Sequence, residues 1–168
     1  MSVVLVMGVS GVGKSTVGRR LAEALGYGYA EGDSYHPPAN VEKMRSGRPL
    51  DDADRWPWLR AIAADIDRWL ADGTGMVVAC SALKRSYRDL LIGPRRDVHL
   101  VQLTGEEALI RDRIAARRHE YMPPNLLISQ LATLEPPGAD ERPIVIDVRE
   151  APEACVEAIR NALNGVGR

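Results

Sequence analysis

The chain has 168 residues, of which 45% are hydrophobic and 27% charged, and its formal net charge is −1. These values are typical of a single soluble domain with a substantial core. A charge so close to zero gives no overall attraction to nucleic acid or to anionic lipid, so we expect no nucleic-acid partner. No apolar run approaches the roughly 18 residues that a membrane span needs, so we expect no membrane association.

The first residues and the cysteines bear on the cellular compartment. Met1–Met7 is apolar but short, has no basic lead-in, and runs directly into a glycine-rich turn, which favours a buried strand over a signal peptide. Cys80 and Cys155 have no spacing typical of a disulfide framework or a metal site. Together these features predict a cytoplasmic protein in a reducing compartment.

The basic residues are unevenly chosen, with 19 arginines and only three lysines, Lys14, Lys43 and Lys84. A genome that favours arginine codons is the simplest explanation. A lysine that remains can then mark a place where a compact ammonium is needed and a planar guanidinium would not fit.

Short apolar runs alternate with amphipathic segments along the whole chain. The apolar runs predict strands over residues 3–7, 27–31, 76–80, 98–103 and 144–148. The amphipathic segments predict helices over residues 14–25, 40–45, 58–70, 83–91, 106–117, 125–134 and 152–163. This alternation indicates one α/β domain over residues 1–168, a three-layer α/β/α arrangement around a five-stranded parallel sheet. Ligands of such sheets bind beyond the carboxyl ends of the strands.

A glycine-rich loop, Gly8-Val9-Ser10-Gly11-Val12-Gly13-Lys14-Ser15, joins the first predicted strand to the first predicted helix. It matches the G-x-x-x-x-G-K-[ST] pattern of a P-loop, whose backbone N–H groups surround phosphate. Lys14 should reach the β- and γ-phosphates of ATP, and Ser15 should bind Mg²⁺. A chance glycine turn is disfavoured by the strand-loop-helix context. The residues expected to hold the nucleotide are Gly8, Ser10, Gly11, Val12, Gly13, Lys14, Ser15 and Thr16.

The second predicted strand is followed by Gly32-Asp33-Ser34-Tyr35-His36-Pro37. A carboxylate at Asp33 would face the γ-phosphate, where it can accept a proton from a substrate hydroxyl or help to hold Mg²⁺. An aspartate that only caps a turn is the alternative, and His36 can equally be an ordinary loop histidine. No conventional Walker B aspartate follows the third strand. Asp147 could replace it, but we expect its strand at the sheet edge.

Residues 50–58 resemble a capped helix start, with acidic residues and Pro57 in the first turn. We expect Trp58 to lie in the core, and Arg55 can face the ligand.

Two groups of cations follow later strands. Lys84 and Arg88 are four residues apart, so they should share a helix face whose positive end suits an anionic substrate, although a solvated basic face is equally consistent. Arg111, Arg113, Arg117 and Arg118 crowd the end of the next helix, where arginines can close over a transferring phosphate. Part of that cluster can be structural, because cations at a helix C-terminus are favourable in any case.

The chain resembles the small P-loop gluconokinases, which are related to shikimate and nucleoside monophosphate kinases. The matching segments are GVSGVGKS, GDSYHPPANVEKMRSGRPLDDADRWPWL, CSALKRSYRDLL and SQLATLEPPGADE, at residues 8–15, 32–59, 80–91 and 129–141. The first identifies only a P-loop, whereas the second and third are specific to the family. The resemblance implies sheet order 2-3-1-4-5, a substrate-binding helical segment at about 37–72 and a lid at about 117–125.

This resemblance also implies a reaction, the phosphorylation of the 6-hydroxyl of D-gluconate by ATP with Mg²⁺, and a homodimer. On that basis Asp33 accepts the hydroxyl proton, and Lys14 with the lid arginines Arg117 and Arg113 neutralises the moving phosphoryl group. The residues expected to hold the sugar acid are Asp33, His36, Arg55, Lys84 and Arg88, and those expected to hold the metal are Ser15 and Asp33.

At the lid the family usually carries Lys-Gly-His-Phe, where this chain has Arg118-His119-Glu120-Tyr121. Two other functions remain open from the sequence. One is a kinase for another small acceptor, such as shikimate or a nucleotide. The other is a regulator that binds a nucleotide without turning it over.

Overall fold

The computed structural model describes residues 1–116 and 124–166. Its strands form one parallel sheet in the order β2-β3-β1-β4-β5, which confirms the predicted topology. The strands are β1 Val3–Met7, β2 Gly28–Glu31, β3 Met76–Ala79, β4 Val98–Thr104 and β5 Ile144–Asp147. Because β1 lies in the middle, its five residues are all buried.

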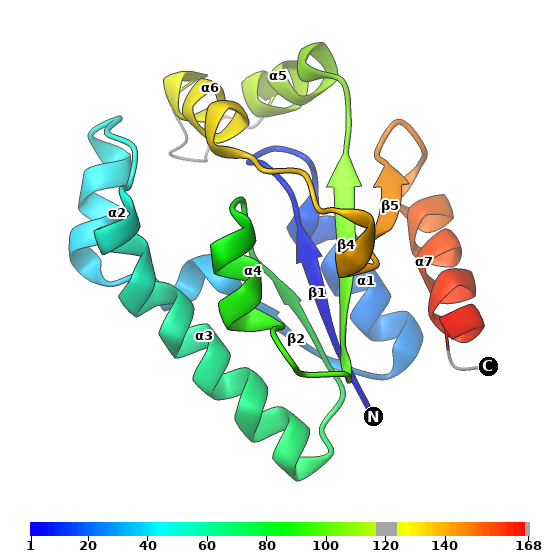
Figure 1. Cartoon of the computed structure of the whole chain (residues 1–168). Helices are drawn as coiled ribbons and strands as arrows, with labels where there is room; N and C mark the ends of the chain where they lie inside the picture. The colour runs from blue at the N-terminus through cyan, green and yellow to red at the C-terminus, as the bar shows by residue number, and fades with distance from the viewer. Residues whose placement is uncertain (117–123, 167–168) are drawn as a thin grey trace.

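Helices cover both faces of the sheet and its carboxyl edge (Figure 1). They are α1 Lys14–Leu25, α2 Pro38–Arg45, α3 Asp52–Asp72, α4 Arg85–Leu91, α5 Glu107–Ala116, α6 Pro124–Thr133 and α7 Pro152–Val166, with short 3₁₀ turns at η1 Gly32–Tyr35 and η2 Ala139–Glu141. None of the helices in the described part of the chain is both long enough and apolar enough to cross a bilayer.

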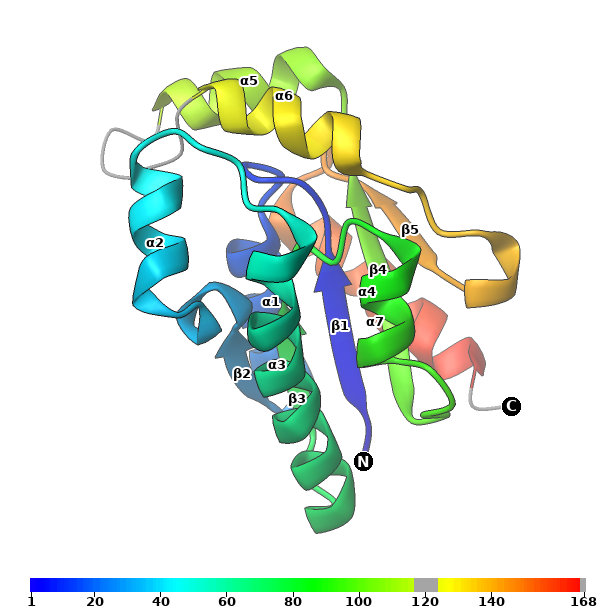
Figure 2. The same cartoon turned by 60° about the vertical axis from the view of Figure 1, so that its left-hand side comes forward.

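The side chains of β1 alternate between two cores, as the pleat of a strand requires. Val4 and Val6 pack in the core that includes α1 and α7, whereas Leu5 and Met7 pack in the core that includes α3 and α4. The three-layer α/β/α prediction is therefore confirmed. The helices α5 and α6 lie across the carboxyl edge, above the loop that follows β1 (Figures 1 and 2).

Two helices next to the site begin elsewhere than predicted. Helix α3 begins at Asp52 instead of Trp58, because Asp51 and Asp54 form a reciprocal capping box at its start, and Pro57 lies inside the helix. Helix α4 begins at Arg85 instead of Leu83, and Lys84 is its extended N-cap residue. Lys84 therefore does not lie on the helix face that carries Arg88.

Candidate active site

The phosphate loop between β1 and α1 depends on its glycines. Gly8, Gly11 and Gly13 have φ values of 153°, 82° and 101°, in the region that other residues rarely adopt. A Cβ atom on Gly8 would lie 2.7 Å from Cγ1 of Val12 and 2.9 Å from the carbonyl oxygen of Leu103. Gly13 caps α1 without any side-chain hydrogen bond to the first turn. The backbone N–H groups there form the anion-binding end of a helix.

Helices α5 and α6 pack directly on this loop. The backbone N–H of Ser10 donates to Oε1 of Gln130 at 2.6 Å. A Cβ atom on Gly11 would lie 2.5 Å from Cγ1 of Ile114, so the chain needs glycine there as well. Lys14 folds over the loop, and its ammonium donates to the carbonyl oxygens of Gly8 and Val9 at 2.9 and 3.0 Å.

A pocket opens beside the phosphate loop, on the side of α7. The guanidinium of Arg113 lies in its wall and donates to the carbonyl oxygens of Val12 and Val148, at 3.4 and 2.6 Å. Its largely uncharged lining and position next to the phosphates suit the base and sugar of a nucleotide. The lining residues are Val12, Gly13, Thr16, Val17, Arg113, Val148, Glu150, Pro152 and Cys155.

Glu31, the last residue of β2, was missed as a site residue. Its Oε2 accepts hydrogen bonds from the Ser15 hydroxyl and from the Tyr29 hydroxyl, each at 2.6 Å. A Cβ atom on Gly18 would lie 2.8 Å from Cε2 of Tyr29, so this glycine makes room for the tyrosine ring. The position of Glu31 at the carboxyl end of a strand was the available signal.

The turn that carries Asp33 is held against the end of β3. A Cβ atom on Gly32 would lie 2.2 Å from the carbonyl oxygen of Ala79, so only glycine allows this approach. The indole Nε1 of Trp58 donates to the Gly32 carbonyl at 2.7 Å. Trp58 is only 2% exposed, which confirms it as a core residue. Asp33 itself is exposed at this edge of the sheet.

The pKa of the buried Cys80 thiol reflects the charged side chains near it. Its pKa is raised to about 12, mainly by burial; the negative charges of Asp33 and Glu31 contribute to the rise, and the positive charge of Lys14 opposes it. Asp33, Glu31 and Lys14 therefore act on one point of the sheet edge. The structure brings the predicted base and the predicted phosphate-binding lysine to the same place.

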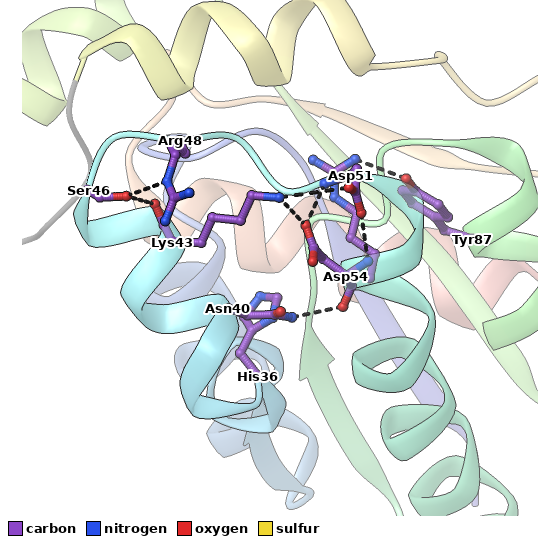
Figure 3. Close-up of polar contacts among 9 residues, drawn as sticks. His36, Asn40, Lys43, Ser46, Arg48, Asp51, Asp54 and Tyr87 are labelled. Atoms are coloured by element: carbon purple, nitrogen blue, oxygen red, sulfur yellow. Dashed lines mark hydrogen bonds and ion pairs between the residues drawn. The ribbon is translucent and has the colours of Figure 1, made fainter.

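His36 follows the Asp33 turn and packs on Trp58. The two rings are stacked, with centroids 4.1 Å apart and planes inclined by 21°. Nδ1 of His36 lies 3.2 Å from Nδ2 of Asn40 (Figure 3). Burial, together with the positive charge of Arg55, lowers the pKa of His36 to about 4. The imidazole is therefore neutral near pH 7.

Arg55 and Lys84 meet around Tyr87. Arg55 donates to the Tyr87 hydroxyl at 2.9 Å, and Lys84 donates to both carboxylate oxygens of Asp52 at 3.0 and 3.2 Å. The Tyr87 hydroxyl also donates to Asp52. Hydrogen bonds from Tyr87 and Lys84 lower the pKa of the Asp52 carboxyl. Arg55 makes no ion pair within the described residues, so its charge is available to an anion.

Arg88 has the contacts of a structural residue instead of those of a ligand-binding one. It is 1% exposed, and its Nε and Nη2 donate to Glu141 at 2.7 and 3.2 Å. Its Nη1 donates to the carbonyl oxygens of Ala82 and Leu83 at 2.9 and 3.1 Å. These bonds hold the β3–α4 loop, where Ala82 has a φ of 45°. The predicted pairing of Arg88 with Lys84 on one surface is wrong.

The other predicted residues divide as follows. Arg117 and the Arg118–Tyr121 lid sequence lie outside the described residues. Asp147 is in the edge strand β5, and its Oδ2 pairs with Nε of Arg149 at 3.1 Å. Within the described residues, no three His, Cys, Asp or Glu side chains come together as a metal cluster. Mg²⁺ sites built around phosphates need only one or two protein ligands, so Ser15 with a nearby carboxylate is an adequate set.

All three lysines lie on the ligand side of the sheet. Lys14 is in the phosphate loop, Lys43 of α2 pairs with Asp54 at 2.6 Å, and Lys84 pairs with Asp52. Figure 3 shows Lys43 reaching across to the start of α3.

The strand order and the phosphate loop define a P-loop nucleotide-binding fold, and a family model described as an AAA domain matches residues 3–137. A gluconokinase of Gluconobacter oxydans is 51% identical over 162 residues, covering 92% of this chain and 87% of that protein. The crystal structure of a gluconokinase from Sinorhizobium meliloti has a TM-score of 0.84 and 45% identity, covering 94% of this chain and 88% of that chain. An unliganded sugar kinase from Janibacter sp. reaches a TM-score of 0.93 at 43% identity, over 98% and 95% of the two chains. The chain belongs to the family of P-loop gluconokinases.

Proposed function

We propose that this protein transfers the γ-phosphoryl group of ATP to the 6-hydroxyl of D-gluconate, giving 6-phospho-D-gluconate and ADP. The observation that carries the proposal is the placement of Asp33 at the edge of the sheet beside Lys14 and the phosphate loop. A protein that only sensed nucleotide would need no carboxylate there. Family membership supplies the acceptor, because the related enzymes are gluconokinases.

The nucleotide fits the phosphate loop and the adjoining pocket. The loop approaches its ligand with bare backbone at Gly8, Gly11 and Gly13, where side chains would fill the cradle. The N–H groups from Gly11 to Thr16 bind the phosphates in this proposal, and the N–H of Ser10 joins them only if it leaves Oε1 of Gln130. The pocket walled by Arg113 takes the nucleoside. Arg113 then acts mainly on the nucleotide, and Arg117 remains the proposed lid arginine.

Mg²⁺ would be held by Ser15 and Asp33, and when bound it supplies positive charge to the phosphate oxygens. Glu31 supports this assignment. Its carboxylate accepts a hydrogen bond from the Ser15 hydroxyl, so the lone pairs of Ser15 Oγ remain for a cation. Glu31 therefore orients Ser15 for the ion, although Glu31 itself is not assigned as a metal ligand.

Two residues of the chain act on the reacting atoms. Asp33 orients the 6-hydroxyl and accepts its proton as the oxygen attacks phosphorus and ADP leaves. Lys14 leaves the carbonyl oxygens of Gly8 and Val9 for phosphate oxygens and stabilises the charge that shifts toward the leaving group. Positioning and electrostatics account for most of the rate, since the protein forms no covalent bond with either substrate.

The sugar acid lies between the Asp33 turn and the start of α4. His36 offers a ring nitrogen, and Arg55, which has no ion pair within the described residues, offers its guanidinium to the carboxylate. Lys84 contributes a second cation, which also donates to Asp52. Arg88 takes no part, because its donors are engaged with Glu141 and two carbonyl groups.

We extend the proposal to the assembly and location of the enzyme. The family resemblance favours a homodimer, which light scattering coupled to gel filtration would test. A cytoplasmic location follows from the expected metabolic role and stays a prediction.

An acceptor panel tests the proposed function directly. ADP release is measured with gluconate, glucitol, shikimate and AMP at fixed ATP and Mg²⁺. Gluconate should give turnover at least ~10-fold above neutral glucitol, since a charge-assisted hydrogen bond to its carboxylate contributes roughly 1.5–3 kcal/mol. Shikimate and AMP are also anions, so they test the shape of the acceptor site instead of its charge. Turnover with shikimate or AMP instead would show another small-molecule kinase. ATP binding without acceptor-dependent turnover would show a regulator. No feature of the site favours either alternative.

A further inference from the structure

Asn40, on α2, is a buried polar residue that the proposed reaction does not use. It is 4% exposed. Its side-chain nitrogen Nδ2 donates to the backbone carbonyl oxygen of Asp54 at 2.9 Å, and the same atom lies 3.2 Å from Nδ1 of His36. Figure 3 shows the Asn40 amide between the histidine and the start of α3.

The partner at Asp54 fixes which way the amide points. A backbone carbonyl oxygen can only accept, so the Asn40 atom that faces it must be the NH₂ nitrogen. That nitrogen has a second hydrogen, and its other neighbour is Nδ1 of His36. Nδ1 must therefore be the acceptor, and a neutral imidazole whose Nδ1 accepts carries its proton on Nε2.

The surroundings keep the ring neutral. One face of His36 is stacked on Trp58, which keeps water that would solvate a charge away from that side of the ring. Protonation at Nδ1 would also bring an N–H against the Asn40 NH₂ group.

The Nε2–H group is left to face a ligand. Nε2 has no hydrogen-bond partner within the described residues. Every buried side-chain nitrogen or oxygen in that part of the chain does have a partner. His36 is only partly buried by the described residues, so its Nε2–H can meet a ligand. The backbone N–H of His36 donates to the carbonyl oxygen of Asp33 at 3.3 Å, which joins His36 to the Asp33 turn.

We propose that Asn40 is a positioning residue that fixes His36 as the neutral Nε2–H tautomer, so that Nε2 donates a hydrogen bond to an oxygen of the bound sugar acid. The proposal rests on the proposed function for the identity of the ligand only. The tautomer itself is a property of the free protein.

A purely structural role of Asn40 would give a different result. Asn40 joins α2 to the start of α3, and Lys43 does the same through Asp54 and Asp51, at 2.6 and 3.8 Å. Within the described residues, the polar partners of Lys43 are Asp54 and Asp51, whereas the His36 ring bonds to Asn40. Lys43→Met is thus a matched control that loosens the same two helices without touching the imidazole.

The first experiment needs no variant of the positioning residue. The protein is labelled with ¹⁵N-histidine, and its ring nitrogens are observed by NMR at pH 7.5. The chain has three histidines, His36, His99 and His119, and His36→Gln identifies the signals of interest. We expect Nδ1 of His36 to be unprotonated and Nε2 to carry the proton, with the Nε2 signal moving when gluconate is added without ATP. A proton on Nδ1, or a cationic ring, overturns the proposal.

The second experiment measures the consequence for the acceptor. Asn40→Leu removes the donor, and Asn40→Asp replaces it with an acceptor that favours a proton on Nδ1. Both should raise the KM for gluconate roughly 3- to 10-fold, the loss of one neutral hydrogen bond, with the KM for ATP within about twofold. Asn40→Asp should also reverse the tautomer, whereas Lys43→Met should leave the wild-type ¹⁵N pattern.

Equal kinetic effects of Asn40→Leu and Lys43→Met would mean that Asn40 only joins the helices, and the proposal would be wrong. If an Asn40 variant does not fold, the wild-type spectrum and its response to gluconate still decide the matter. A correct tautomer in a protein that turns over no gluconate would overturn the proposed function and leave the tautomer standing.

Discussion

The hydroxyl of Ser15 donates a 2.6 Å hydrogen bond to Oε2 of Glu31, so the serine of the phosphate loop is oriented by a carboxylate from a strand two places away in the sheet. The same oxygen accepts the Tyr29 hydroxyl. One oxygen of Glu31 thus holds two hydroxyls, one of them that of the proposed metal ligand.

Glu31→Gln should weaken the response to Mg²⁺. The substitution keeps the shape of the side chain but removes the charge, so the Ser15 hydroxyl is held less firmly. We expect the Mg²⁺ concentration for half-maximal rate to rise roughly 10-fold, in the range found for residues that orient a metal ligand. Calorimetric titration of Mg·ATP gives a readout independent of turnover. Tyr29→Phe is the control, because it removes only the other hydrogen bond, and an equal effect of both variants would contradict the role of Glu31.

Lys14→Ala should lower kcat by at least ~10²-fold while the fold survives, because the ammonium acts on charge that develops during transfer. Its two bonds to loop carbonyls are at the surface of the loop, so their loss should leave the circular dichroism spectrum unchanged. Both quantities are measured on the same preparation. Near-normal turnover would exclude the loop as the phosphoryl-transfer site.

Asp33→Asn should lower kcat strongly with ATP binding retained. The amide has nearly the same shape as the carboxylate, but it cannot accept the hydroxyl proton. Steady-state kinetics with gluconate and fluorescence titration with ATP separate the two effects. A kcat within about threefold of wild type would mean that Asp33 is not the base.

Arg88→Met and Lys84→Met should have opposite signatures. Without Arg88, the carboxylate of Glu141, only 9% exposed, loses its partner, and unpairing a buried charge costs roughly 3–5 kcal/mol of unfolding free energy. Adding Glu141→Leu should restore part of that stability. Lys84→Met should change stability little but lower kcat/KM for gluconate roughly 10-fold. Urea unfolding and gluconate kinetics measure both. A stable Arg88→Met protein with a lowered kcat/KM for gluconate would mean that Arg88 binds the acceptor.

His36 should make stability depend on pH in one window. Its pKa falls from 6.5 to about 4 on folding, so between these values the unfolded chain binds a proton that the native protein does not. Stability is therefore unaffected above pH 6.5 and decreases as the pH falls toward 4. A discounted magnitude for this partly exposed ring is roughly 2 kcal/mol. The free energy of unfolding is compared for wild type and His36→Gln at pH 7.5, 6 and 5. A constant difference would show that His36 is not held neutral.

The fold could be predicted because local signals agreed with one another. The apolar runs of β1, β3 and β4 have no amphipathic alternation, as expected for strands covered on both faces, and a helix signal follows each of them. The start of α3 was placed too late, since Pro57 was taken for a first-turn residue. The bond from the Asp51 side chain to the Asp54 N–H, at 2.8 Å, begins the helix earlier, and such a bond depends on the side-chain conformation that the chain adopts.

The site was only partly predictable for a similar reason. The phosphate loop and Asp33 follow strands directly, so their place at the sheet edge is fixed by topology. Lys84 and Arg88 lie close together in the sequence but differ in burial. The guanidinium of Arg88 is buried against Glu141, which lies 53 positions away in the chain. Glu31 and Asn40 act through partners 16 and 14 positions away. No local pattern encodes such pairings.

The distribution of lysines has a practical consequence for handling the enzyme. The ε-amines of Lys14, Lys43 and Lys84 all lie toward the carboxyl edge of the sheet, whereas the α-amine of Met1 precedes β1 at the opposite edge. Reagents that acylate ε-amines can therefore react only on the catalytic side of the molecule. Coupling through lysine to a sensor surface or a resin would orient the protein with its entrance blocked, and ATP in the coupling buffer should protect Lys14 from modification. A tag attached ahead of Met1 would present the ligand side to solvent instead.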